Sequence, residues 1–235
     1  MSIKGIFPID KWDFKSESIL ADLPEDVYEL LIAHKSELVF RKNDILFREG
    51  SFPSGIFYIV KGKVKKYKVD NEGKEQIIYL AGAGQLIGYH AVLSDDRYPD
   101  SAAAIEDSVV VFIPKEDFLK TLDYSPVFNY RLLKTLSHEF AVLANNLTFF
   151  AQKTVRERLA LQLVIIREKY KVNYVEGMPI EISISREDLA SLVGTTRESI
   201  VRILTEFKVD GILETKGRKI IIKDVNALIG IADHK

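Results

Sequence analysis

The sequence predicts an α+β fold in which a β-rich part, a long helix and a helical C-terminal part follow one another. Three observations predict it. Short runs rich in Ile, Val, Phe and Tyr, separated by glycines, occupy residues 44–114. A leucine-rich stretch over residues 133–150 repeats its apolar positions at steps of three and four. Two short amphipathic helices joined by a glycine turn are expected over residues 185–207. We therefore divide the chain into residues 1–122, 123–152 and 153–235.

The first part begins with a short entry and a predicted helix, "EDVYELLIAHKSEL" (25–38). The runs "DILFREG", "GIFYIVKGKVKKYKV", "EQIIYLAGAGQLIG" and "SVVVFIP" are predicted strands, because they are β-branched and aromatic and are bounded by glycine. "DNEGKE" between two of them predicts a hairpin turn. Many short strands with regular turns indicate a compact β-barrel or sandwich.

The second part is a helix with a heptad repeat. A period near 3.5 residues is typical of a helix that packs along a partner helix, so we predict a dimer helix. The alternative is an amphipathic helix packed on its own domain, since the repeat covers little more than two heptads. The repeat consists of Leu133, Leu136, Phe140, Leu143, Leu147 and Phe150.

The third part opens with a predicted helix, "VRERLALQLVIIREKY", and a loop or strand, "VEGMPIEISI". Ser185 with Asp188 three residues later is a helix start signal, and Thr195 with Glu198 predicts a second capping box. Gly194 between them supplies a tight turn. This order is a helix-turn-helix, an arrangement whose second helix enters the DNA major groove.

The second of these helices has two unlike faces. Arg197 and Arg202 lie toward its N-terminal half, where an arginine can donate two hydrogen bonds to guanine. Glu198 can accept from a cytosine amino group, and it precedes Arg202 by four residues, a spacing at which it can instead pair with Arg202 and hold that side chain in place. The alternative is that Glu198 only caps the helix and that the two arginines are solvated. The opposite, anchoring face consists of Ile200, Ile203, Leu204 and Phe207.

A basic hairpin follows this helix. "ILET" and "KIII" are predicted strands joined around Lys216, Gly217 and Arg218. Its tip is placed to touch phosphate, a contact that adds affinity and salt dependence but no base specificity.

Composition limits the remaining choices. The formal net charge is −1, but residues 153–235 hold 15 Lys and Arg against 12 Asp and Glu. A slightly basic C-terminal part permits DNA binding without requiring it. The chain has no cysteine, which excludes disulfides, cysteine-ligated iron–sulfur clusters and thiolate zinc sites. No metal site is predicted.

We expect no enzyme. The four histidines, at positions 34, 90, 138 and 234, are far apart in the sequence, and neither a phosphate loop nor a nucleophile motif occurs. No run has the length of a signal peptide or a membrane span. We therefore expect a cytoplasmic protein with no membrane partner.

"ISREDLASLVGTTRESIVRILTEFKVDGILETKGRKIII" closely resembles the DNA-binding domain of the cyclic-AMP receptor protein/fumarate-nitrate regulator (CRP/FNR) family. The glycine-rich strands resemble that family's cyclic-nucleotide-binding β-roll, a jelly roll, and the leucine-rich helix resembles its dimerisation helix. The resemblance covers about residues 23–225. It implies a winged helix-turn-helix and a homodimeric transcription regulator on a roughly palindromic duplex DNA site, with RNA polymerase as a further partner.

The resemblance also implies site residues. Glu187 departs from the pattern, because the best-known member has an uncharged amide there, and a carboxylate weakens a phosphate contact. The implied base readers are Thr196, Arg197, Glu198, Ser199 and Arg202. The implied backbone contacts are Ser185, Arg186, Thr195, Lys216, Arg218 and Lys219.

The effector region departs further from the family's cyclic-AMP site. Tyr89 stands where a Glu receives the ribose, and Asp100 stands where an Arg holds the phosphate, before a matching Ser101. We therefore expect no cyclic-AMP binding, unless Arg97 compensates. His90 matches a haem ligand of carbon-monoxide sensors, but the accompanying cysteine is missing, so haem is not expected and the effector is unknown. The pocket candidates are Gly88, Tyr89, His90, Arg97, Ser101, Ala102, Phe140, Leu143 and Ala144.

A second class of function stays open, namely a cyclic-nucleotide-type ligand-binding module that acts through protein contacts. The helix-turn-helix argues against it, because such modules do not carry "TTRESIVRIL".

Overall fold

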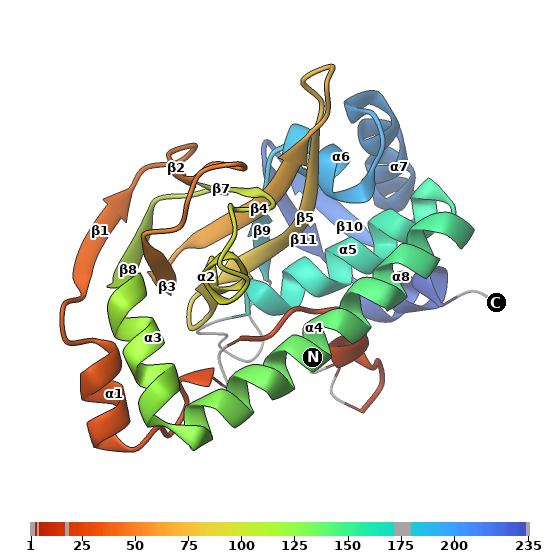
Figure 1. Cartoon of the computed structure of the whole chain (residues 1–235). Helices are drawn as coiled ribbons and strands as arrows, with labels where there is room; N and C mark the ends of the chain where they lie inside the picture. The colour runs from red at the N-terminus through yellow and green to blue at the C-terminus, as the bar shows by residue number, and fades with distance from the viewer. Residues whose placement is uncertain (1–2, 4, 17–18, 172–179, 234–235) are drawn as a thin grey trace. The chain divides into compact units, whose positions relative to one another are not determined.

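Figure 1 shows the computed structural model of the chain, which describes all residues except 1–2, 4, 17–18, 172–179 and 234–235. The chain divides into two compact units, one of Phe14–Ala141 and one of Met1–Asp13 with Val142–Lys235. This division falls inside the longest helix, α4 (Pro126–Gln152). The functional boundaries at residues 122 and 152 stay a prediction.

The first unit contains two four-stranded antiparallel sheets, which we call the β-roll. One sheet has the order β1-β8-β3-β6, and the other β2-β7-β4-β5. The predicted turn is confirmed between β4 and β5, where the Asp70 carboxylate accepts from the Glu72 and Lys74 N–H groups at 2.9 Å each. The strands are β1 (Ser36–Phe40), β2 (Ile45–Phe47), β3 (Gly55–Lys61), β4 (Lys63–Val69), β5 (Glu75–Gly82), β6 (Leu86–Ile87), β7 (Ser101–Ala104) and β8 (Ser108–Pro114).

A core of residues from both sheets fills the β-roll. It includes Phe47, Ile59, Val64 and Val110, which come from four different strands. Gly62, between β3 and β4, has a φ of +94°, and a Cβ there would lie 2.2 Å from the Ser108 hydroxyl oxygen. Only glycine fits this link, because the conformation is left-handed and the space is filled.

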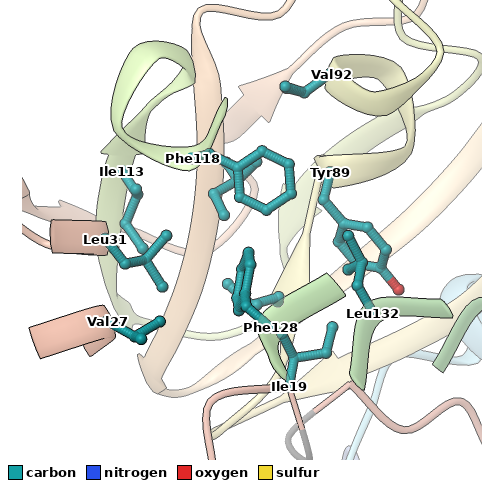
Figure 2. Packing of buried hydrophobic residues seen from close by; sticks show 11 residues of the cluster. Ile19, Val27, Leu31, Tyr89, Val92, Ile113, Phe118, Phe128 and Leu132 are labelled. Carbon is teal, nitrogen blue, oxygen red and sulfur yellow. The ribbon is translucent and has the colours of Figure 1, made fainter. Parts of the chain in front are cut away.

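Helices cover one sheet of the β-roll through a second core (Figure 2). They are α1 (Glu25–Leu31), α2 (Tyr89–Leu93), α3 (Lys115–Tyr124) and the first half of α4. Phe118 of α3 packs edge-to-face on Phe128 of α4, and Tyr89 of α2 lies in the same core. Neither α2 nor α3 is predicted from the sequence.

The predicted helix over residues 25–38 is wrong at its C-terminal end. It stops at Leu31, and Ser36 already begins β1. The His34 N–H donates to the Asp117 carboxylate at 2.9 Å, and β1 then pairs with β8 along its whole length. Pairing with a distant strand therefore overrides the local helical pattern.

The second unit holds the C-terminal helices and a three-stranded sheet. The sheet has the order β10-β11-β9. Its predicted strand region is only partly testable, since residues 175–179 lie outside the described residues and Glu181–Ser183 forms β9. The other elements are η1 (Ile9–Lys11), α5 (Val155–Lys169), α6 (Arg186–Val193), α7 (Arg197–Val209), β10 (Leu213–Lys216), β11 (Lys219–Ile222) and α8 (Val225–Ala232).

Across the described part of the chain, no helix combines the length and the apolar character that crossing a membrane requires.

Candidate nucleic-acid interface and effector region

The turn between α6 and α7 is built from capping residues. The Ser185 side chain caps α6 by accepting from the Asp188 N–H, as predicted, and Gly194 ends α6 with a φ of +70°. The predicted cap of α7 is wrong by one residue. Thr196, and not Thr195, is the N-cap, and its side chain accepts from the Ser199 N–H at 3.2 Å. The Thr195 N–H instead donates to the Ala190 carbonyl, which closes the turn.

The two faces of α7 are as predicted. Ile200, Ile203, Leu204 and Phe207 are buried and hold the helix on its own unit. On the other side of its N-terminal half, Thr196, Arg197, Glu198, Val201 and Arg202 are exposed, and Ser199 is partly exposed. This leaves one side of α7 free of the protein core.

The two arginines of this exposed face have partners on the chain itself. The Arg197 Nε lies 2.7 Å from a Glu187 carboxylate oxygen, and the Arg202 Nη1 lies 2.8 Å from a Glu206 carboxylate oxygen. The expected pair of Arg202 with Glu198 is therefore wrong, because Arg202 turns toward the C-terminal end of its helix. Exposed ion pairs of this kind contribute about 0–1 kcal/mol, so both guanidinium groups can exchange partners at small cost.

Glu206 is itself held from a second helix. Arg156 of α5 donates from Nη1 to its other carboxylate oxygen at 2.7 Å and from Nη2 to Asp210 at 3.0 Å. The guanidinium of Arg156 also lies over the Phe207 ring, 4.6 Å from the centroid. Glu206, which orients Arg202, is thus held in place by α5.

The strands β10 and β11 form the predicted basic hairpin, with Lys216 paired to Lys219 in the register. Lys216 and Arg218 are exposed at its tip. Lys219 differs, since its ammonium lies 2.5 Å from a carboxylate oxygen of Glu181 on β9. The tip therefore offers two unengaged cations among the described residues.

Arg186, at the start of α6, links that helix to the hairpin. Its guanidinium donates to the carbonyls of Gly217 at 3.2 Å and Arg218 at 3.5 Å. Burial lowers the pKa of Arg186. The side chain fixes the position of the hairpin tip, and the Ser185 hydroxyl beside it serves the helix cap.

Helix α4 carries two apolar faces. Phe128, Leu132, Val142 and Phe149 are buried. The predicted heptad residues mostly point elsewhere, with exposures of 75% for Phe140 and Leu147 and 63% for Leu133. Leu143 is also exposed, whereas Leu136 and Phe150 are partly buried.

The interior of the β-roll contains a buried ion pair that is not among the predicted site residues. The Lys66 ammonium lies 2.9 Å from the Asp100 carboxylate, and these two residues are only 4% and 7% exposed. Lys66 also lies over the Tyr79 ring, 5.4 Å from the centroid. The second oxygen of Asp100 has no hydrogen-bond partner among the described residues.

A second pair, of a half-buried histidine and a buried carboxylate, joins α2 to α4. His90 Nε2 lies 2.8 Å from the carboxylate of Glu139, which is buried. The Tyr89 ring stacks on His90, with 4.3 Å between centroids. Burial raises the pKa of Tyr89, and the Glu139 carboxylate raises it further. Burial likewise raises the pKa of Tyr79, assisted by Glu139 and Asp100, so both phenols stay protonated.

The other effector candidates do not gather around one site. Gly88 takes a φ of +85° and precedes α2, while Ala102 is buried in the core of the β-roll. The Ser101 hydroxyl accepts from the Glu49 N–H at 2.9 Å. Arg97 is exposed, donates to the Gly50 carbonyl at 2.7 Å and lies over the Phe52 ring. Phe140, Leu143 and Ala144 are exposed on α4.

One pattern in the sequence did point to Lys66. Val64 and Lys66 are two residues apart on β4, so they share a face, and Val64 is buried. Strict alternation therefore places Lys66 inside. Glu139 and Tyr79 carry no comparable pattern, because their neighbours come from distant parts of the chain.

Comparison with known proteins agrees with this architecture. Residues 37–125 match the family of cyclic nucleotide-binding domains, and residues 157–231 match the Crp-like helix-turn-helix domains. The chain is 28% identical over 194 residues to the fumarate and nitrate reduction regulatory protein of Escherichia coli K12, covering 83% of this chain and 77% of that one.

Two further proteins are similar. The transcriptional activator protein anr of Pseudomonas aeruginosa is 25% identical over 192 residues, covering 82% of this chain and 78% of that one. The structure of FixK2 from Bradyrhizobium japonicum superposes with a TM-score of 0.75 at 22% identity, covering 86% of this chain and 98% of that one. The structural likeness shows the shared fold.

Proposed function

The chain belongs to the CRP/FNR family of transcription regulators and binds DNA through its helix-turn-helix, and we propose that it does so as a homodimer on a roughly palindromic site. The observation that carries the proposal is the pair of independent exposed surfaces, the polar face of α7 and the apolar stripe of α4. A dimeric transcription regulator needs both surfaces, one to bind DNA and one to pair with a second copy, whereas an enzyme needs neither.

The stripe of α4 supports the dimer. Leu133, Phe140 and Leu147 follow one another at seven-residue intervals and are all largely exposed. Exposed apolar side chains in such a row are stabilised when a second copy of the helix covers them. A two-fold dimer then presents two copies of α7, which must lie about 34 Å apart to enter successive major grooves.

Base reading is assigned to the exposed start of α7. Arg202 and Arg197 would exchange their glutamate partners for guanine, and Glu198, which has no partner among the described residues, would accept from cytosine. The Thr196 hydroxyl accepts from the Ser199 N–H and donates to the Ser199 hydroxyl oxygen, each at 3.2 Å, so we assign both residues a secondary part in base reading. Lys216 and Arg218 would contact phosphate.

The residues of the β-roll do not fit a cyclic nucleotide. A buried phosphate requires positive or N–H donor groups, and the residue that resemblance places there is Asp100, whose charge is already matched by Lys66. Arg97 is committed to Gly50 and Phe52 at the surface. Calorimetric titration with millimolar cyclic AMP should therefore give no binding heat. Saturable heat that disappears in Arg97→Ala would contradict this.

No cysteine is present to hold an iron–sulfur cluster, and His90 Nε2, the candidate haem ligand, faces Glu139. We therefore propose regulation by an effector of another kind or by none. RNA polymerase as partner and a cytoplasmic location are further parts of the proposal. The alternative of a purely protein-contacting ligand module has no observation in its favour.

The proposal is tested by selecting bound duplexes from a random pool and measuring the stoichiometry of the complex by sedimentation velocity. We expect two inverted half-sites about one helical turn apart and two chains per duplex. The variant Phe140→Glu/Leu147→Glu should be monomeric and lose this site, whereas Val39→Glu, which alters an equally exposed apolar residue on β1, should not. One chain bound to a single half-site would refute the dimer.

A further inference from the structure

A short segment from the start of the chain, Ile9–Asp13, packs on the C-terminal helices. It belongs to the same compact unit as Val142–Lys235, although the whole β-roll lies between the two in the sequence. The 3-10 turn η1 gives the segment a defined shape, and the Trp12 N–H closes it by donating to the Ile9 carbonyl at 2.9 Å. We call this segment the brace.

The brace contacts the second half of α4. The Asn145 side chain donates to the Lys11 carbonyl at 3.0 Å. The Trp12 ring packs edge-on against the ring of Phe149, with 5.0 Å between the centroids. Asn145 and Phe149 lie on the side of α4 opposite to Leu147, because a helix turns by about 100° per residue. The brace therefore leaves the apolar stripe of α4 open, and Leu147 is 75% exposed.

The brace is also tied to α5. The Asp13 carboxylate lies 2.7 Å from the Lys169 ammonium, and the two side chains are only 12% and 8% exposed. Such a pair keeps its partners, because separation would leave each charge uncompensated in the interior. The next residue, Phe14, is fastened to the β-roll, where its ring stacks on Tyr79 with 4.2 Å between the centroids. The chain is thus held on both sides of Asp13.

The two helices that the brace joins meet at a short joint. Only Lys153 and Thr154 separate α4 from α5, and rotation about their backbone dihedrals changes the angle between the helices. Helix α5 in turn holds α7, since Arg156 donates to Glu206 at 2.7 Å. The angle at the joint therefore sets where α7 lies relative to the apolar stripe on the second half of α4. The brace restricts this angle, because it contacts the helices on both sides of the joint.

We propose that Trp12 and Asp13 are positioning residues for DNA binding, which join α4 to α5 and so fix the spacing between the two copies of α7 in the dimer. The inference rests on the proposed homodimer. It adds to that proposal the part of the chain that selects one distance between the half-sites.

The test measures the dissociation constants of three duplexes, namely the selected duplex and two versions with one base pair inserted or removed between the half-sites. The unaltered protein should bind the selected duplex best, because its two copies of α7 are held at one spacing. In Trp12→Ala and in Asp13→Asn, fewer molecules have the competent angle, so binding to the selected duplex should weaken about five- to tenfold. A looser joint reaches the altered spacings more easily, so the preference for one spacing should shrink.

Two further variants separate positioning from a general loss of stability. Trp12→Phe keeps an aromatic ring against Phe149 and should keep the preference for one spacing. Ile6→Ala is the matched control, since Ile6 is an exposed apolar residue that lies just before the brace, and it should behave as the unaltered protein does.

The inference is overturned if Trp12→Ala and Asp13→Asn lower the thermal stability but keep the full preference for one spacing, which is the result of a merely structural role. Failure of the proposed dimer would look different, because the unaltered protein would then bind all three duplexes alike.

Discussion

On α7 the charged pairs lie at the surface, whereas inside the β-roll they are buried. Arg197 and Arg202 each form an ion pair that is exposed to solvent. Either arginine can leave its glutamate for a base at small cost. Lys66 and Asp100 cannot separate, because each would leave an uncompensated charge in the interior. The ion pairs of α7 can therefore change partners, whereas the ion pair inside the β-roll keeps its own.

The largest effect expected from this difference is in the β-roll. Asp100→Ala leaves the Lys66 ammonium buried and unpaired, so the free energy of unfolding should fall by about 3–5 kcal/mol. Urea denaturation measures it. The double variant Lys66→Met/Asp100→Leu removes both charges and keeps the volume, so it should lose far less. If the single and double variants lost the same free energy of unfolding, the unpaired charge of Lys66 would not be the cause of the loss.

A smaller effect on the free energy of unfolding is expected at the N-terminal cap of α5, where the carboxylate of Glu157 is partly exposed. The Thr154 side chain and N–H, with Lys153, hold the pKa of Glu157 down from its ordinary 4.5 to about 2. A lowered pKa stabilises the fold above pH 4.5, and this contribution disappears as the pH falls through about 2.

Thr154→Ala should therefore cost about 1 kcal/mol at pH 7. The difference in thermal stability between the unaltered protein and Glu157→Gln should shrink steadily between pH 5 and pH 2. If the difference in thermal stability between these two proteins did not vary with pH, the ionised carboxylate of Glu157 would not be its source.

The smallest effect on stability is expected on the exposed pair of α6 and α7. Glu187→Gln should change the free energy of unfolding by less than about 0.5 kcal/mol, because both partners are exposed. It should nevertheless tighten binding to DNA, since it frees Arg197 and removes a carboxylate next to the duplex. Weaker binding in Glu187→Gln would mean that Glu187 is needed to aim the arginine.

The sequence could predict those features that depend on residues close together in the chain. The capped helices around Gly194 and the buried face from Ile200 to Phe207 depend on neighbours three or four residues apart, so their pattern is visible locally. The predicted partner of Arg202, Glu198, was wrong because Arg156 from another helix orients Glu206 toward it. The pair of His90 with Glu139 joins residues 49 positions apart, and no local pattern contains it.

The most direct test of the account is the ratio of dissociation constants for scrambled and selected duplexes, measured for two variants in parallel. Arg202→Ala should lose about 1–3 kcal/mol on the selected duplex alone, so its ratio should collapse. Lys216→Ala should weaken both duplexes alike, keep the ratio and flatten the salt slope by roughly one unit. Equal losses on both duplexes in both variants would contradict base reading by α7.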